Sequence, residues 1–377
     1  MEVYLEPIKI AFFTFPLLAL LITLPYLIYQ YHKFGSVPFL RSAIVYTFAL
    51  YLLTAFFLVI LPLPSRQAVA LMPTKTPQLI PFHFIKDFMD NTNIVWKDPK
   101  SYLTLIKNPT VYTVLFNIVL TIPFGIYLRY YFEKKWSKVL LASFLLSLFF
   151  EVTQLTGLFG IYPKAYRLFD VDDLLMNTLG GMIGFWITPL LTCFLPSRKK
   201  LDETSYKKGQ EVSIYRRIIA FFIDMGGYTL CFGIVSLLFP HWNQYPILFL
   251  LAFLIYYILI PIITNGYTIG KFVVKIRLAY KGKRGRIFFL ILRECLLYLG
   301  TLLLPFYCLN LLEIDTNSIF MERLIHLIVL FFLIYYLTFL LQFFKSLVGK
   351  KRPFLYEKIT KTENVSTIVI NMELQEK

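Results

Sequence analysis

Charged residues are scarce in this sequence. They make up 16% of its 377 residues, against about 25% in a typical soluble protein, whereas hydrophobic residues make up 58%. Continuous apolar runs of about 20 residues, the length that crosses a hydrocarbon core, recur along the chain. Because these runs do not alternate with polar residues, they exclude a β-barrel. The composition therefore predicts an all-α polytopic membrane protein.

Cysteine and histidine are also rare, with four residues of each. Cys193, Cys231, Cys295 and Cys308 lie in or beside apolar runs, and none belongs to a Cys-x-x-Cys pair, so neither a disulfide framework nor a cysteine metal site is expected. The Gly-x-Thr-x-Gly-Lys stretch at 266–271 lacks the spacing of a phosphate-binding loop. No cofactor is therefore expected.

Positive charge, in contrast, is in excess, with a formal net charge of +16. In a soluble protein such an excess suggests nucleic-acid binding. In a membrane protein it indicates basic loops that hold helix ends against anionic lipid. We therefore expect membrane lipids as partners and no nucleic acid, and nothing in the sequence indicates an oligomeric state.

The apolar runs predict nine transmembrane helices. Lysine and arginine gather in alternate short connections, which places those connections in the cytoplasm, the N-terminus outside and the C-terminus inside. The loop 62–109 also carries lysines, but long loops cross largely regardless of charge. The predicted spans are 9–29, 42–61, 110–129, 138–156, 174–195, 215–239, 245–263, 287–308 and 324–344.

A polar segment divides these spans into two groups. Residues 196–213, "PSRKKLDETSYKKGQEVS", contain Pro, Gly and Ser and are interpreted as a cytoplasmic linker. We therefore expect one membrane domain at 1–195, a second at 214–370, and a short tail at 371–377.

Polar residues gather at the predicted outer end of the first domain. In the fourth span, Glu151 and Gln154 are three residues apart and share one helix face. Asn117 lies in the outer half of the third span, and Arg167 precedes the fifth. An unpartnered carboxylate at this depth is costly, so these side chains are expected to contact one another.

The fifth span begins with three aspartates, in "YRLFDVDDLLMNTLGG" at 166–181. Asp170, Asp173 and Asn177 are spaced by three and four, which places them on one face of a helix, whereas Asp172 points elsewhere, as a cap or toward solvent. Glycines follow this stripe and favour close helix packing behind it. These are Gly180, Gly181 and Gly184.

Two interpretations of the outer cluster remain open. In one, Arg167 pairs with Glu151 or an aspartate and tethers two helix ends, while Asp170 or Asp172 caps a helix. In the other, which we favour because so many polar groups converge at one depth, the cluster forms a polar pocket that faces outward. Its residues are Glu151, Gln154, Arg167, Asp170, Asp173, Asn177 and Asn117.

Four stretches of this domain resemble the VanZ-like family, named after a bacterial accessory protein of teicoplanin resistance. They are "LIPF" at 79–82, "NIVLTIPFG", "EVTQ" and "YRLFDVDDLLMNTLGG", and they cover about residues 40–195. The resemblance implies a role in the bacterial cell envelope and a location in the cytoplasmic membrane, with the outer-cluster residues as the matching polar positions. It implies no particular reaction.

The chemistry of such a cluster has several possible forms. Paired carboxylates can hold a divalent cation that bridges to phosphate, or act as acid and base. Arg167 can instead bind a phosphate or carboxylate directly. Because the cluster contains no histidine and no nucleophile motif, catalysis is not favoured, the catalytic residues stay unassigned, and we expect no protein metal site.

A second polar set lies in the other domain. Arg217 and Asp224 are seven residues apart and share a helix face, with Asp224 about two turns into an apolar span. Such a residue is either a functional group or half of a structural ion pair, and Arg217 or Lys271 is the expected partner. The alternation in "KFVVKIRLAY" at 271–280 indicates an amphipathic segment at the inner surface.

These residues resemble the RDD family of bacterial membrane domains over roughly 212–370. The resemblance rests on Arg-x-x-Ala-x-x-x-Asp at 217–224, on Thr-x-Gly-Lys ending at Lys271, and on Arg293. It implies a domain in which ion exchange has been suggested for some members. Glu357, in "YEK", stands where the family has its second aspartate, and Tyr356 replaces a histidine.

Three functions from different classes remain. The leading one is an envelope protein that binds an anionic lipid-linked precursor or glycopolymer outside and modulates susceptibility to teicoplanin-type glycopeptides. The second is an ion- or proton-coupled transporter acting through Asp224. The third is a membrane-embedded hydrolase or transferase of lipid phosphates, which requires a metal or a perturbed carboxylate.

Overall fold

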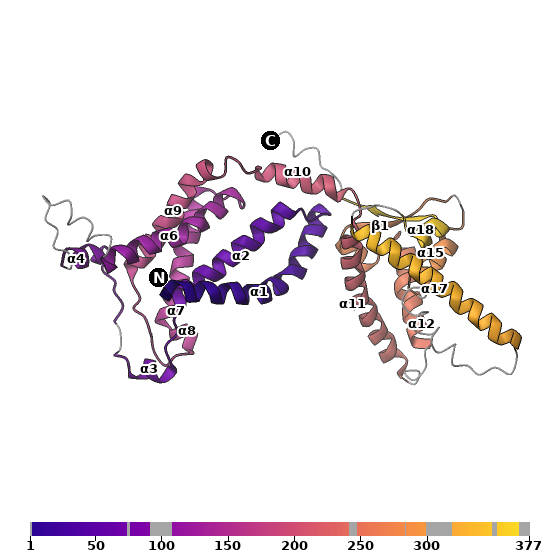
Figure 1. Cartoon of the computed structure of the whole chain (residues 1–377), viewed down its shortest axis with the longest axis horizontal. Coiled ribbons are helices and arrows are strands. Elements are labelled where there is room, and N and C mark those ends of the chain that lie inside the picture. Colours follow the sequence, from indigo (N-terminus) through magenta and orange to yellow (C-terminus); the bar gives the residue numbers. More distant parts are fainter. Residues whose placement is uncertain are drawn as a thin grey trace. The chain divides into compact units, whose positions relative to one another are not determined.

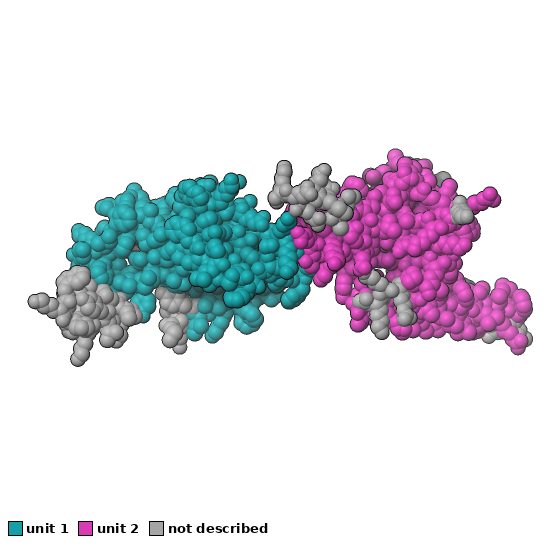
Figure 2. All heavy atoms as spheres, turned by 90° about the horizontal axis from the view of Figure 1, so that it is seen from above, with its two compact units in different colours: residues 1–23, 38–201 teal, residues 24–37, 202–377 magenta. Residues whose placement is uncertain are grey.

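The computed structural model describes residues 2–73, 76–90, 108–240, 247–282, 284–298, 319–348 and 353–368. These residues are mostly helical, which confirms the predicted all-α fold class. They fold as two compact units, shown in Figure 2. Unit 1 comprises residues 1–23 and 38–201, and unit 2 comprises residues 24–37 and 202–377.

Seven helices in the described part of the chain are long and apolar enough to cross a membrane. The molecule is therefore a multi-pass membrane protein. The helices are α1 (Glu2–Phe34), α2 (Phe39–Ile60), α6 (Pro109–Tyr130), α7 (Trp136–Leu155), α9 (Val171–Leu191), α11 (Ile214–Leu238) and α17 (Ile319–Leu347).

The two remaining predicted spans look different. The span at 245–263 appears as a shorter apolar run, Ile247–Ile263, in which α12 (Ile247–Phe253), the π-helical η3 (Leu254–Leu259) and α13 (Ile260–Ile263) follow one another. The span at 287–308 begins as α15 (Arg286–Glu294), and its second half lies outside the described residues. The count of nine and the orientation of the termini stay predictions.

Unit 1 is built around the contact of α9 with α6 and α7 (Figure 1). Small residues permit this approach. A Cβ atom added to Gly180 would lie 2.1 Å from the carbonyl oxygen of Ile118, and one added to Gly181 would lie 2.0 Å from Oγ of Ser143. At Gly184 the nearest atom, a carbonyl oxygen of α6, would again be 2.1 Å away. The three glycines therefore serve close helix packing, as their spacing predicts.

Short segments complete unit 1 at one end of this bundle. They are α3 (Arg66–Leu71), α4 (His83–Asp90) and α8 (Gly157–Gly160). Gln78 forms a parallel β-bridge with Asp170. The N–H of Gln78 donates to the carbonyl oxygen of Phe169 at 2.8 Å, and the N–H of Val171 donates to the carbonyl oxygen of Gln78 at 3.1 Å. The chain before α4 is thereby fixed to the start of α9.

Unit 2 combines α11 and α17 with short helices and a two-stranded sheet. Strand β1 (Ile276–Tyr280) pairs antiparallel with β2 (Thr362–Ser366), with Leu278 opposite Asn364. The alternating segment 271–280 is therefore a strand only in its second half, because its first residues complete α14 (Ile269–Val273). Helix α18 (Leu355–Thr360) leads into β2.

The segment predicted as a linker, 196–213, contains a helix, α10 (Arg198–Gly209). The boundary between the two units falls inside this helix, between residues 201 and 202. Residues 24–37, which comprise the C-terminal part of α1 and the three residues after it, belong to unit 2.

Candidate functional site

The outer cluster of unit 1 joins three helices and the end of a fourth. Its members come from α6, α7, α9 and the segment that precedes α9, and they meet the last residues of α2. Most of them are buried, and their described hydrogen bonds go to one another, to Ser147 or to the main chain. The sequence-predicted residues do lie together in this unit.

Arg167 holds the end of α2. Its Nη1 donates to the carbonyl oxygen of Val59 at 2.8 Å, and its Nη2 donates to that of Leu61 at 3.2 Å. The side-chain amide of Gln154 donates to the same Val59 oxygen at 3.2 Å. Carbonyl groups at a helix C-terminus carry partial negative charge and lack intrahelical partners, so a cation is well placed here. Arg167 thus tethers two helix ends, but through carbonyls and not through the expected contact with Glu151.

Asp170 caps α9. Its Oδ1 accepts the N–H of Asp172 at 2.8 Å, and its own N–H donates to Oε2 of Glu151 at 3.0 Å. The buried Glu151 side chain therefore holds the main chain just before α9. Burial raises the pKa of the Asp170 carboxyl above its ordinary value, although the N–H of Asp172 opposes this shift.

Asp172 differs from its predicted role. Its side chain is 4% exposed, so it does not face solvent. The N-cap of α9 is Asp170, and Asp172 lies inside the helix. Its Oδ1 accepts the N–H of Phe82 at 2.5 Å, and its Oδ2 accepts the N–H of Phe84 at 2.9 Å. Phe82 has a positive φ of 60°, and α4 starts directly after it. The carboxylate therefore fixes the turn that begins α4, which a helical-face argument confined to α9 does not reveal.

Asp173 and Asn177 face α6 and α7. The amide of Asn117 donates to Oδ1 of Asp173, and the amide of Asn177 donates to Oγ of Ser147 at 3.0 Å. Thr121 of α6 donates to the carbonyl oxygen of Asn177 at 2.6 Å. The stripe predicted for α9 thus contacts its neighbouring helices. Ser147 and Thr121 were missed because isolated hydroxyl residues in an apolar helix carry little sequence signal.

A divalent cation receives little support from this arrangement. Each of the four carboxylates, those of Glu151, Asp170, Asp172 and Asp173, already accepts a hydrogen bond from an N–H group. Within the residues that the structure describes, no group of three or more His, Cys, Asp or Glu side chains is arranged to hold a metal ion. Arg167, the one cation among the residues of the outer cluster, is partly exposed.

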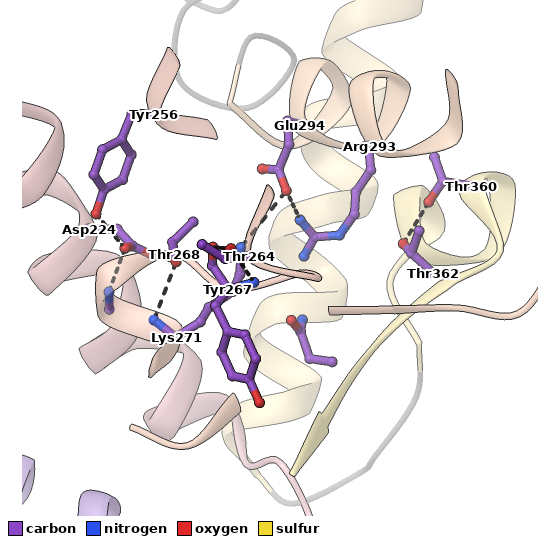
Figure 3. Close-up of polar contacts among 12 residues, drawn as sticks. Asp224, Tyr256, Thr264, Tyr267, Thr268, Lys271, Arg293, Glu294, Thr360 and Thr362 are labelled. Atoms are coloured by element: carbon purple, nitrogen blue, oxygen red, sulfur yellow. Dashed lines mark hydrogen bonds and ion pairs between the residues drawn. The ribbon is translucent and has the colours of Figure 1, made fainter. Parts of the chain in front are cut away.

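In unit 2, Asp224 lies at the centre of a hydrogen-bonded group, shown in Figure 3. It is 1% exposed, and its Oδ1 accepts from the hydroxyl of Tyr256 at 2.8 Å and from the N–H of Gly270 at 2.7 Å. Its Oδ2 accepts from Oγ1 of Thr268 at 2.7 Å, and Thr268 in turn caps α14. The expected ionic partners, Arg217 and Lys271, are not among these donors. Three donors on one carboxylate are typical of a structural group that fixes a turn.

Arg217 pairs with Glu357 instead. Its Nη1 donates to Oε1 of Glu357 at 2.9 Å, and the amide of Asn364 donates to the same oxygen at 3.2 Å. The other oxygen of Glu357 accepts the N–H of Phe354 at 3.1 Å. This carboxylate therefore joins α11, α18 and β2.

Arg293, Glu294 and Lys271 form a buried charged group. Nη1 of Arg293 donates to Oε1 of Glu294, and Nζ of Lys271 lies 3.9 Å from that oxygen, which is too long for a hydrogen bond (Figure 3). Burial lowers the pKa of the Lys271 amine, and the Glu294 carboxylate opposes this shift. Glu294 was not among the predicted site residues, although its position next to Arg293 was visible in the sequence.

Arg216 was also missed. Its side chain is fully buried and donates to the carbonyl oxygens of Gly209, Val274 and Lys275 at 2.9, 2.7 and 2.6 Å. It therefore ties α10, α11 and the start of β1 together. The sequence offers two adjacent arginines at the start of α11, and only the fold shows that one meets the main chain and the other meets Glu357.

Comparison with known proteins supports part of this picture. Residues 48–192 match the model of the VanZ/LLP1 family, which confirms the resemblance over most of the expected 40–195. The matched region carries every residue of the outer cluster and lies within unit 1. No curated protein and no solved structure matches the chain.

Proposed function

We propose that this protein resides in the bacterial cytoplasmic membrane and binds an anionic lipid-linked precursor or glycopolymer at the outer face through unit 1. Binding there would change the susceptibility of the cell to teicoplanin-type glycopeptides. The match of residues 48–192 to the VanZ/LLP1 family supports an envelope role. The position of Arg167 is the observation that carries the choice of an anionic ligand.

Arg167 is held in place and still accessible. Its side chain is partly exposed, and the two described bonds to Val59 and Leu61 use two of its five N–H donors. An arginine whose position is fixed by such bonds loses little conformational freedom when it binds a phosphate or carboxylate. The cluster around it therefore serves as the support of an anion contact.

The surroundings favour a ligand that is attached to lipid. The segment fixed by Asp172 carries large apolar side chains that are mostly exposed, namely Leu79, Ile80 and Phe82. Helix α4, which follows, has apolar and polar residues on opposite faces, as helices at a membrane surface do. A headgroup close to Arg167 would thus be accompanied by apolar surface that can contact lipid chains.

Substitution of Arg167 tests this proposal. We expect Arg167→Met to abolish the change in teicoplanin susceptibility that the protein confers on a host bacterium, and to weaken binding of undecaprenyl phosphate in phosphatidylcholine nanodiscs by about 10- to 100-fold. Arg167→Lys should retain part of both effects, since it keeps the charge but loses the paired geometry. Abundance in the membrane is measured for each variant.

Arg66→Met is the matched control, because Arg66 is exposed at the start of α3 and belongs to the same unit. It should leave both measurements unchanged. The proposal is wrong if Arg167→Met and Glu151→Gln, present at normal abundance, leave susceptibility and binding as they were.

We also propose that unit 2 is related to the RDD family. The residues that carry the resemblance lie in one region of this unit: Arg217 contacts Glu357, while Lys271 and Arg293 both face Glu294. The hydrogen bonds of Asp224 favour a structural role for this aspartate over a place in a proton relay. Proteoliposome ion flux that Asp224→Asn abolishes, in a correctly folded protein, would contradict that assignment.

A further inference from the structure

Unit 2 contains a cavity of about 360 Å³ between α11, α15, α17 and the start of α18. Much of its lining is apolar and aromatic, including Phe221, Leu297, Phe339 and Phe343. Phe222 also lines it and is 60% exposed, so the cavity reaches the surface of α11. In a membrane, that surface of a spanning helix is in contact with lipid.

The charged residues of the lining are cations and one carboxylate, and two of the cations are paired with carboxylates that lie behind the lining, Arg217 with Glu357 and Arg293 with Glu294. Among the described residues of the lining are three cations, Arg217, Lys271 and Arg293, and one carboxylate, that of Asp224. Asp224 already accepts hydrogen bonds from Tyr256, Thr268 and Gly270. The lining therefore offers the charged donors of Lys271 and Arg293 to a ligand, beside the hydroxyls of Tyr298, Tyr336 and Tyr356 and the amide of Asn364.

Two of these cations are buried and have donor atoms without a hydrogen-bond partner. Lys271 and Arg293 are 7% and 2% exposed, and Nζ of Lys271 and Nε of Arg293 have no partner among the described residues. Removing charged donors from water without a hydrogen bond is costly. An acidic group placed between them would supply the missing acceptors.

We propose that this cavity binds a single-chain acidic amphiphile, with its carboxylate or phosphate at Lys271 and Arg293 and its acyl chain against the aromatic lining of α11 and α17. A volume of about 360 Å³ lies at the lower end of the range for ligand pockets, about 300 to 1,000 Å³, and therefore favours one chain over two. Free fatty acids and lysophospholipids share this chemistry.

A second, more polar cavity adjoins the first and gives a polar headgroup a way to extend. Arg217 and Phe354 line both cavities. The second one carries three lysines and three glutamates, namely Lys281, Lys358, Lys361, Glu211, Glu357 and Glu363. This site lies in unit 2 and does not depend on the ligand proposed for Arg167 in unit 1.

The test uses the full-length protein in a nonionic detergent and a stearic acid that carries a nitroxide label near its methyl end. Immobilisation of the label, measured by electron paramagnetic resonance, reports binding. We expect saturable binding of the acid and binding of its methyl ester weaker by about 10-fold or more, because the ester lacks the charge that the buried donors require.

Unlabelled competitors distinguish the sources of the ligand. Displacement by oleate alone assigns a fatty acid, and displacement by lysophosphatidic acid alone assigns a lysophospholipid headgroup. Displacement by both supports the shared acidic chemistry. Equal displacement by oleyl alcohol or lysophosphatidylcholine would overturn the proposal, since neither carries a net negative charge.

Two variants locate the site within unit 2. Lys271→Met should weaken binding of the acid by about 10-fold or more, whereas Lys345→Met, at an exposed lysine near the end of α17, should leave it unchanged. Leu340→Trp fills the cavity from α17 without altering any charge, and should weaken binding of acid and ester alike. Unchanged binding in Leu340→Trp, with normal thermal stability, would overturn the proposal even if Lys271→Met fails to fold.

Discussion

The polar clusters of the two units use similar side chains for different purposes. In unit 1 the charged groups mainly hold main chain: Arg167 donates to carbonyls, and Asp172 accepts from two N–H groups. In unit 2 several charged groups face one another, as Arg217 does with Glu357 and Arg293 with Glu294. Ionic pairing among side chains is therefore a feature of the second cluster.

This difference changes what each cluster can offer a ligand. Each carboxylate of the outer cluster is engaged by an N–H group, and the one cation among the cluster residues, Arg167, is partly exposed. Opposite charges in unit 2 satisfy each other incompletely, because Nζ of Lys271 lies 3.9 Å from Glu294 and has no hydrogen-bond partner among the residues that the structure describes. The proposed acidic ligand would therefore bind to the donors that this incomplete pairing leaves without an acceptor, and the number of charges matters less.

The largest effect is expected where a buried carboxylate accepts several donors. Asp224→Ala leaves the hydroxyls of Tyr256 and Thr268 and the N–H of Gly270 without their acceptor, at a cost of about 3–5 kcal/mol in the stability of unit 2. Hydrogen exchange, resolved by peptide, should show loss of protection over 268–280 and unchanged protection over 171–190 in unit 1.

Two variants serve as controls for this prediction. Asp224→Asn keeps one acceptor oxygen and should lose less protection than the alanine variant. Glu363→Ala removes a carboxylate that is 45% exposed and should have almost no effect, since exposed ion pairs contribute little. Equal protection of 268–280 in the wild type and in Asp224→Ala would show that the carboxylate does not stabilise the turn at the start of α14.

The sequence identified Asp224 but not its role. A single aspartate in an apolar helix is conspicuous, so its burial could be predicted. Its partners could not, because Tyr256 lies on another helix and Gly270 donates through its main chain, which every residue possesses. Helical spacing therefore predicted Asp224 as the partner of Arg217. In the fold, Arg217 forms its ion pair with Glu357, 140 residues away.

The helices and the packing glycines of unit 1 were easier to predict than its contacts. Apolar runs and the spacing of Gly180, Gly181 and Gly184 contain local information that the structure confirms. Asp172 was misplaced because helical periodicity describes only neighbours on the same helix. Its donors lie 90 and 88 residues earlier in the chain, in a segment that the periodicity of α9 cannot locate.

A smaller and more local effect is expected at Asp172. Asp172→Ala removes the acceptor of two N–H groups, at a cost of about 1.5–3 kcal/mol that falls on the turn before α4. Lys86 lies within α4, so we expect trypsin to cleave there faster in the variant, while hydrogen exchange in α6 and α7 stays unchanged.

Asp87→Ala is the matched control, because Asp87 belongs to α4 and contacts His83 at the surface. It should leave the trypsin cleavage rate close to that of the wild type. If both variants accelerate cleavage equally, the turn is not held by Asp172, and the contrast between main-chain and side-chain bonding in the two units is lost.

The smallest effect is expected at Asp170, and it depends on pH. Burial raises the pKa of this carboxyl above its ordinary value of 3.8, so between that value and the folded-state pKa the folded protein binds more protons than the unfolded chain. Stability then falls as pH rises through this window and increases as pH falls through it. Asp170→Asn removes this titration and should flatten the dependence of the thermal midpoint on pH.

At neutral pH the same variant should differ from the wild type by less than about 0.5 kcal/mol, because asparagine caps helices about as well as aspartate does. Asp170→Ala, which loses the cap, should cost about 1 kcal/mol at every pH. The two variants separate the charge of Asp170 from its hydrogen bond to Asp172. If Asp170→Asn keeps the pH dependence of the wild type, the carboxyl is not desolvated in the folded protein, and the outer cluster offers a ligand a hydrated carboxylate as well as Arg167.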